Sequence, residues 1–180
     1  PYQVLSQFSP SPGKFTLKDF FAVANDVYPV GRLDYDSEGL LLLTNDTRLN
    51  HQWLHPLSKV EKEDWVQVEG SMHKEAIGAL ENGLLISIDG KPYHTQPAKA
   101  RLLATPPLLP ERTPPIRYRA TIPTSWLSLT ISEGKNRQVR RMTAAVGFPT
   151  LRLVRWRQGH LTIAGMQPGD MRPLKSLLHK

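Results

Sequence analysis

The feature that most constrains this chain is a run of four leucines placed directly behind a cluster of charge, in the stretch GRLDYDSEGLLLLTND at residues 31–46. A continuous apolar run that ends at Asn45-Asp46 predicts a buried central strand over Leu40–Thr44. A carboxylate beside such a strand must be paired or must lie in a cleft, because an isolated buried charge is costly. The stretch therefore offers Asp34, Asp36 and Glu38 as candidate functional carboxylates and leaves open which of them are paired and which lie in a cleft.

The remaining hydrophobic periodicity predicts more strands than helices. Strands are expected at residues 2–8, 65–69, 84–88, 99–104, 118–122, 125–132 and 151–154, and helices at residues 16–24, 46–53, 73–82 and 136–146. Because the two types of element do not alternate as βαβ units, the order favours an α+β fold with a largely antiparallel sheet.

The chain has 180 residues, enough for one core or for two small lobes that share a sheet. We expect a single domain over residues 1–180, and the five prolines in residues 105–115 mark the candidate hinge between its lobes. Because the chain begins at Pro1, we expect its start to have been trimmed. It contains no cysteine and no apolar run that would span a bilayer, which favours a cytoplasmic protein without disulfides, and a monomer is the default.

Positive charge is concentrated in the last third of the chain. Residues 1–111 carry 10 Lys+Arg and 14 Asp+Glu, whereas residues 112–180 carry 13 Lys+Arg and only two acids, Glu133 and Asp170. Ten of these 13 cations are arginines, which suit bidentate phosphate contacts and stacking on bases. Nucleic acid is therefore the favoured partner, with an anionic membrane or simple solubility as the alternatives.

The basic motif SEGKNRQVRRMTAAVG, residues 132–147, follows a predicted strand and opens a helix. Asn136 is the expected N-cap, and Gly147 fits the left-handed position after the last turn. A stripe of cations at Arg137, Arg140 and Arg141 should face an anion, because three arginines so close repel one another. We therefore expect Asp34 to lie opposite Arg140, which would keep this carboxylate ionised and fix its rotamer as a nucleophile or a base.

Other kinds of site lack support in the sequence. Gly134-Lys135 is not a P-loop, because position 136 is Asn and the earlier glycine is missing. Residues 34–45 begin like an EF-hand loop but end at Asn45, with leucines where ligands are needed. The six histidines have no metal-binding spacing, and no serine lies in a nucleophile elbow, so no metal or cofactor is expected.

Together, GRLD and GLLLLTND within residues 31–46, EGKNRQVRRM at 133–142, TPPIRYR at 113–119 and GFPTLRLVR at 147–155 resemble the RsuA family of pseudouridine synthases. The resemblance is closest to the RluE type, which acts on large-subunit (23S) ribosomal RNA and lacks a preceding S4-like domain. It implies a long mixed, mostly antiparallel sheet in two lobes with a central RNA-binding cleft. It also implies that a flipped uridine is detached at N1–C1′ and rejoined through C5 without a cofactor, in 23S RNA or a large-subunit precursor.

Carried over to this sequence, the resemblance makes Asp34 the catalytic aspartate, Arg140 its basic partner and Leu153 an apolar residue under the base. Whether the aspartate attacks C1′, adds to C6 or removes a 2′ proton stays open. The expected RNA contacts are Arg32, Lys135, Arg137, Arg141 and Arg155. Asp36 and Glu38 have no family role and are interpreted as carboxylates that hold nearby arginines or backbone amides.

One position departs from the family, which usually has a tyrosine two residues before the valine of the VxVEG strand. Here Asp64 occupies that place and Trp65 follows. Strand periodicity puts them on opposite faces, so either a shift in the strand lets Trp65 supply the aromatic contact to the base or that role moves elsewhere. An acid near Asp34 would also oppose its ionisation, which keeps open a protein that binds RNA but turns over poorly.

Three functions are therefore weighed. The first is an enzyme that isomerises one uridine of ribosomal RNA, and the second is a ribosome assembly factor that only binds RNA in the same basic cleft. The third, a phosphate-ester hydrolase, would need metal ligands that the sequence does not offer.

Overall fold

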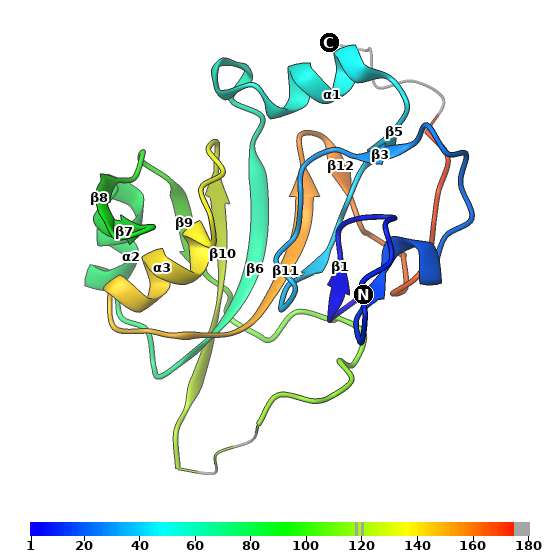
Figure 1. Ribbon diagram of the computed structural model, residues 1–180. Helices are drawn as coiled ribbons and strands as arrows, with labels where there is room; N and C mark the ends of the chain where they lie inside the picture. The colour runs from blue at the N-terminus through cyan, green and yellow to red at the C-terminus, as the bar shows by residue number, and fades with distance from the viewer. Residues whose placement is uncertain (118, 120, 175–180) are drawn as a thin grey trace.

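The computed structural model describes residues 1–117, 119 and 121–174. Its centre is a sheet with strand order β12-β11-β6-β10-β9, to which β4 adds by pairing with β11 (Figure 1). These strands are β4 (Glu38–Gly39), β6 (Lys62–Glu69), β9 (Lys99–Leu102), β10 (Thr124–Ile131), β11 (Thr150–Gln158) and β12 (Leu161–Thr162). The β4–β11 pairing is parallel and the others are antiparallel, so the expected α+β fold with a mixed, mostly antiparallel sheet is confirmed.

Smaller elements surround this sheet. Three two-stranded pairs are β1 (Val4–Leu5) with β2 (Phe15–Thr16), β3 (Tyr28–Pro29) with β5 (Leu43–Thr44), and β7 (Leu85–Ile88) with β8 (Lys91–His94). The helices are α1 (Thr47–Leu54), α2 (Lys74–Asn82) and α3 (Gln138–Ala145), with short 3-10 turns at Leu17–Asp19 and Pro56–Ser58. Figure 1 shows α2, α3 and the β7–β8 hairpin gathered beside β9 and β10, and α1 at the opposite end of β6 from the loop before β10.

The main core lies between α2, α3 and one face of the central sheet. Alternate residues of β6 and β10 supply it, and Val66, Val68, Leu127 and Leu129 are completely buried there. A second, smaller core packs around α1, with members Val30, Leu40, Leu42, Leu49 and Trp53. The alternation of apolar and polar residues in β6 is what predicted a strand with two different faces, and the structure confirms it.

Capping residues fix the ends of α1 and α2, close to the bounds that the sequence predicts. The Asp46 carboxylate accepts hydrogen bonds from the backbone N–H groups of Arg48 and Leu49 and thereby starts α1. His73 caps α2 in the same way, and Gly83 ends it with a φ of 81°.

The leucine run is not the central strand that its composition predicts. It is an extended segment with alternating burial, in which Leu40 and Leu42 are buried and Leu41 and Leu43 are half-buried. Its hydrogen bonds change partner halfway, because Leu40 N–H donates to the Arg155 carbonyl whereas the Leu42 carbonyl accepts from Val30. The run therefore bridges the central sheet and the β3–β5 pair rather than belonging wholly to either.

Gly39 allows this bridge to form. A Cβ at this position would lie 2.3 Å from the Arg155 carbonyl oxygen, and the residue has a φ of 113°. Only glycine fits such a close approach in this conformation, so the segment that follows Asp34 is fixed tightly against β11.

Two other local predictions are wrong. The helix expected over residues 16–24 is a single turn at Leu17–Asp19, in which Thr16 and Asp19 hydrogen bond to each other, and α3 begins at Gln138 rather than just after Asn136. Arg137 has a φ of 53° and is itself the N-cap residue. The sequence also missed β8, and the strand expected over residues 118–122 includes residues outside those described.

Candidate active site

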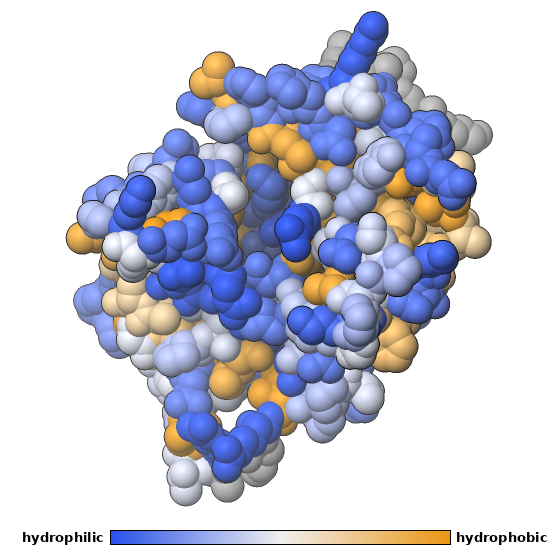
Figure 2. Space-filling view, viewed as in Figure 1, coloured by the Kyte–Doolittle hydropathy of each residue, from blue (hydrophilic) through white to orange (hydrophobic). Residues whose placement is uncertain are grey.

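A cavity of about 430 Å³ opens beside the central sheet and has Asp34 in its wall. Its lining comes from residues 30–34 and Ser37, from the end of α1 and the corner after it, from β6, β8 and β11, and from the loop that leads from β10 into the start of α3. Figure 2 shows the molecule hollowed near the middle of this face, with mainly hydrophilic walls. The cavity thus joins the two charged motifs of the sequence, residues 31–46 and 132–147.

Asp34 lies on a tight turn between β3 and β4. The Ser6 hydroxyl holds the preceding residue, because it accepts a hydrogen bond from Leu33 N–H at 3.0 Å, and the Asp34 carbonyl accepts one from Ser37 N–H at 2.9 Å. The side chain of Asp34 is 31% exposed, and its carboxylate lies 3.9 Å from Arg137 Nη1. The backbone on both sides is therefore fixed while the carboxylate stays accessible from the cavity.

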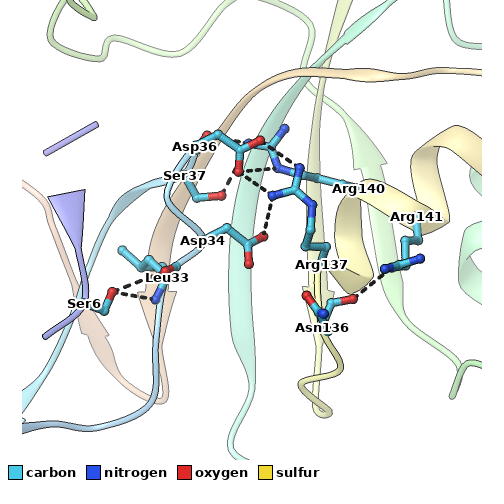
Figure 3. Close-up of polar contacts among 9 residues, drawn as sticks. All are labelled: Ser6, Leu33, Asp34, Asp36, Ser37, Asn136, Arg137, Arg140 and Arg141. Atoms are coloured by element: carbon cyan, nitrogen blue, oxygen red, sulfur yellow. Dashed lines mark hydrogen bonds and ion pairs between the residues drawn. The ribbon is translucent and has the colours of Figure 1, made fainter. Parts of the chain in front are cut away.

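The arginines of the second motif reach this turn but bind mainly to Asp36 (Figure 3). Arg137 donates to both oxygens of Asp36, at 2.7 and 2.8 Å. Arg140 lies with Nε 3.4 Å from the Asp36 carboxylate and donates from Nη2 to the Asp36 carbonyl. The expected direct pairing of Asp34 with Arg140 is wrong, because Asp36 takes that guanidinium and the left-handed Arg137 brings its own side chain nearer to Asp34.

The two aspartates have opposite pKa shifts. Burial raises the pKa of Asp34, and the charge of Asp36 adds to this, although Arg137, Arg140 and Arg155 oppose it. Hydrogen bonding to Arg137 holds the pKa of Asp36 below its usual range. Asp36 thus stabilises the arginines, as its sequence interpretation predicts, whereas Asp34 is the carboxylate whose ionised form is destabilised and hence more basic.

Glu38, the third acid of the motif, is also a structural partner. It accepts two hydrogen bonds from Arg152, from Nε and Nη2, both at 2.9 Å, and both side chains are almost completely buried. This pair joins β4 to β11 and confirms the expectation that Glu38 holds an arginine.

Asp64 and Trp65 lie on opposite faces of β6, and it is Asp64 that lines the cavity. Asp64 is completely buried; its Oδ1 accepts a hydrogen bond from Arg155 Nε at 3.1 Å, and its Oδ2 has no partner among the described residues. Trp65 stacks on Trp156 at 3.9 Å with an interplanar angle of 9°, away from the cavity lining. The proposed contact of Trp65 with the base is therefore wrong, because β6 pairs with β10 in unbroken register at these residues and no bulge turns Trp65 around.

Most of the other predicted site residues lie in or beside the cavity. Leu153, Arg155, Arg32 and Lys135 all line the cavity, with Leu153 buried and Arg32 and Lys135 exposed. Arg137 lies next to Asp34.

Arg141 does not join this set. Its Nη1 donates to the Ser87 carbonyl at 2.6 Å and its Nε to the Asn136 carbonyl at 3.0 Å, so its guanidinium lies beside Asn136 and, unlike that of Arg137, is not directed at Asp34 or Asp36 (Figure 3). Its guanidinium braces the start of α3 against β7, and it is not part of the cavity lining.

Sequence reasoning missed several residues of the cavity. Lys62 precedes Asp64 by two positions in β6, so the two-residue period of a strand would have placed both on the same face. Tyr93 comes from the unpredicted strand β8 and donates its hydroxyl to Glu133, which raises the pKa of Tyr93 to about 12. Glu133 also accepts from Gln96 N–H at 2.9 Å, and this network fixes one wall of the cavity.

Within the described residues, no cluster of three or more His, Cys, Asp or Glu side chains has a geometry that would hold a metal ion. Among the same residues, no helix has the length and apolar character needed to cross a membrane.

Comparison with known proteins gives consistent results. A family model described as RNA pseudouridylate synthase matches residues 1–145. The chain is 49% identical to ribosomal large subunit pseudouridine synthase E of Vibrio parahaemolyticus serotype O3:K6, over 97% of this chain and 71% of that protein. It is 51% identical to the protein of the same name from Xanthomonas campestris pv. campestris, over 96% of this chain and 90% of that one. A solved structure described as a pseudouridylate synthase superposes with a TM-score of 0.79 at 28% identity, covering 97% of this chain and 67% of that one.

Proposed function

Because the chain belongs to the RNA pseudouridylate synthase family, we propose that it converts a specific uridine of large-subunit (23S) ribosomal RNA to pseudouridine, with Asp34 as the essential catalytic group. The names of the two relatives that are about half identical over nearly the whole chain support this class of substrate. The observation that carries the assignment of Asp34 is its place in the wall of the cavity, beside Arg137 and on a turn fixed from both sides.

The cavity has a size and lining that suit a single turned-out base. Its volume of about 430 Å³ lies in the range of small-molecule sites, and enzymes that act on a base of structured RNA take it out of the stack. Leu153, Val139 and Ile131 supply apolar contacts for a flat ring, while Asp34 and Arg155 supply charge. A base in this position would lie against a carboxylate that is held by its fixed backbone and by an ion pair with Arg137 at 3.9 Å.

The reaction needs no exchange of atoms with a cofactor, because the product is an isomer of the substrate. The N1–C1′ bond breaks, a C5–C1′ bond forms, C5 loses a proton and N1 gains one. A carboxylate assists by attack on C1′, by addition to C6 or by removal of a 2′ proton, and each route needs the ionised form of Asp34. The raised pKa of Asp34 supports this role, because it makes the carboxylate more basic.

Cations around the opening of the cavity suit the RNA backbone. Arg32 and Lys135 are exposed at its wall, and Arg137 is exposed beside it. Because the chain carries a net charge of +7, binding should weaken steeply as salt is raised. Arg141 is left out of this set, since both of its contacts are to backbone carbonyls of the protein.

The proposal is tested by incubating the purified protein with a protein-free transcript of 23S RNA and then mapping pseudouridine by carbodiimide labelling and primer extension. We expect a single new stop that increases with time and is absent when the protein is omitted. Binding of the transcript without any stop would contradict the proposal and would favour an assembly factor that only binds RNA.

A further inference from the structure

Lys62 is a half-buried cation in the cavity of Asp34 that none of the proposed steps uses. It begins β6, and its side chain lines the cavity together with Asp34 and Leu153. Within residues 1–117, 119 and 121–174, no hydrogen-bond or ion-pair partner is found for its ammonium group. A cation taken partly out of water without a partner is costly, so such a group points to an anion that arrives from outside.

The charges around Lys62 explain why it has no partner. Asp64 lies two residues away on the same face of β6, but within the described residues its carboxylate accepts a hydrogen bond only from Arg155. Burial lowers the pKa of Lys62 and the charge of Arg155 lowers it further, while Asp64 opposes both effects. The remaining charged groups of the lining are Arg32, Asp34, Glu133 and Lys135. Of these, Glu133 is engaged by Tyr93, Gln96 and Gln138, and the Lys135 ammonium lies 5.0 Å over the Tyr93 ring.

The lining near Lys62 distinguishes between two anions. Phosphate groups stay hydrated and suit the exposed cations Arg32 and Lys135. Lys62 lies deeper, in a wall that it shares with the buried residues Ile131, Val139 and Leu153, which suits a flat base better than a phosphate.

The isomerisation itself produces a suitable anion. When N1–C1′ breaks, its electron pair stays with the uracil, and the negative charge spreads from N1 to the carbonyl oxygens O2 and O4. A preorganised cation in a partly dehydrated site stabilises such a charge far more than water does.

We propose that Lys62 is a further catalytic residue, whose ammonium donates a hydrogen bond to a carbonyl oxygen of the detached uracil and stabilises it until C5 bonds to C1′. This inference rests on the proposed function. Lys62 keeps its proton throughout: the ring supplies the electrons of the new C5–C1′ bond, C5 then loses its proton, and N1 takes one up from solvent. Asp64 supports this role because its charge favours the protonated form of Lys62.

The test compares Lys62→Met, which keeps the length of the side chain but removes its charge, with Lys62→Arg, which keeps the charge. The matched control is Lys99→Met, because Lys99 is an exposed lysine of β9 paired with Glu61 outside the cavity. In single-turnover assays on the 23S transcript, Lys62→Met should lower the rate at saturating enzyme about 10²-fold. Its affinity for the transcript should stay within about twofold of the unmodified protein, Lys62→Arg should recover much of the rate, and Lys99→Met should leave both quantities unchanged.

Two further readouts separate this role from a structural one. The alkaline limb of the pH–rate profile should lie below the range of an ordinary lysine and move to higher pH in Lys62→Arg, because a guanidinium stays charged. A transcript that carries 5-fluorouridine has a better leaving group, so Lys62→Met should slow its rearrangement much less than that of uridine.

The results of these assays distinguish a failure of the role proposed for Lys62 from a failure of the proposed function. If the unmodified protein forms pseudouridine and Lys62→Met forms it at the same rate, or loses as much rate on 5-fluorouridine as on uridine, the role of Lys62 is wrong while the proposed function stands. If the unmodified protein forms none, the proposed function fails first.

Discussion

Strand β6 carries charged residues on both of its faces, and β11 supplies arginines to both. On the face away from the cavity, Glu63 accepts hydrogen bonds from Arg157, from Ser128 and from the Trp65 indole. On the cavity face, Asp64 has one oxygen without a partner and Lys62 has no partner among the residues described. A bulge between Arg155 and Arg157 in β11 lets the two arginines serve opposite faces.

This difference in charge pairing suggests different roles for the two faces of β6. Matched charges and stacked rings stabilise the sheet. Burial raises the pKa of Glu63, but the hydrogen bonds from Ser128, Arg157 and Trp65 outweigh this and leave that pKa lowered. Unmatched charges that are buried, as in Asp64, or half-buried, as in Lys62, cost stability, so their presence on the cavity face supports the proposal that this face binds a group that completes them. The following changes test this contrast, beginning with the largest expected effect.

Replacing Arg155 with Met should be the most destabilising change, because it leaves the carboxylate of Asp64 buried without any partner. We expect a loss of about 3–5 kcal/mol in the free energy of unfolding, measured by urea denaturation. The matched control Arg157→Met, on the opposite face, should cost about 1 kcal/mol, because Glu63 keeps its bonds to Ser128 and Trp65.

A second change distinguishes a buried charge from a lost contact. In the double variant Arg155→Met/Asp64→Leu most of the lost stability should return, because no isolated charge remains. Equal losses in Arg155→Met and Arg157→Met would contradict the contrast between the faces.

Removing the aromatic stack should affect stability but not catalysis. Trp65→Leu loses the ring contact with Trp156 and the hydrogen bond to Glu63, and should cost about 1–2 kcal/mol. Its rate on the 23S transcript should stay within about twofold, because Trp65 does not line the cavity. If Trp65→Leu remains folded but loses much of its rate, Trp65 does contact the base, contrary to the structure.

The smallest effect concerns Asp36, which contacts both Arg137 and Arg140 beside Asp34. Because Asp34 must be ionised and its pKa is raised above the usual 3.8, activity should rise with pH through a limb above that value. Asp36→Asn removes a like charge and frees Arg137 to face Asp34, so the pKa of Asp34 should fall and the acid limb should move to lower pH. The pH–rate profile under single-turnover conditions measures this, and a limb that moves upward would contradict the assigned neighbours.

Much of this arrangement follows from local sequence signals. The hydrophobic periodicity of residues 46–53 and 73–82 and the alternation in β6 act within a few residues, so they predicted α1, α2 and β6. The family motifs likewise predicted that Asp34 and the arginine-rich helix motif would meet, although they are about a hundred residues apart.

The errors come from interactions that a local pattern does not contain. Four leucines read as a central strand, but their hydrogen bonds pass from β11 to β3, which only the tertiary arrangement decides. Arg137 in a left-handed conformation moved the start of α3, and with it the choice of which arginine reaches Asp34. Strand periodicity places Lys62 and Asp64 on one face, but whether that face lines a cavity depends on how β6 pairs with β10 and β11, which lie far along the chain.

The central claim is that Asp34 performs the chemistry, and its most direct test is the single-turnover rate of Asp34→Asn on the 23S transcript with affinity measured in parallel. Asp89→Asn is the matched control, because Asp89 is exposed in a turn with a φ of 49°, which asparagine tolerates. The account predicts that Asp34→Asn binds the transcript within about twofold of the control yet forms pseudouridine more than about 10³-fold more slowly. Pseudouridine formed by Asp34→Asn at the rate of the control would contradict it.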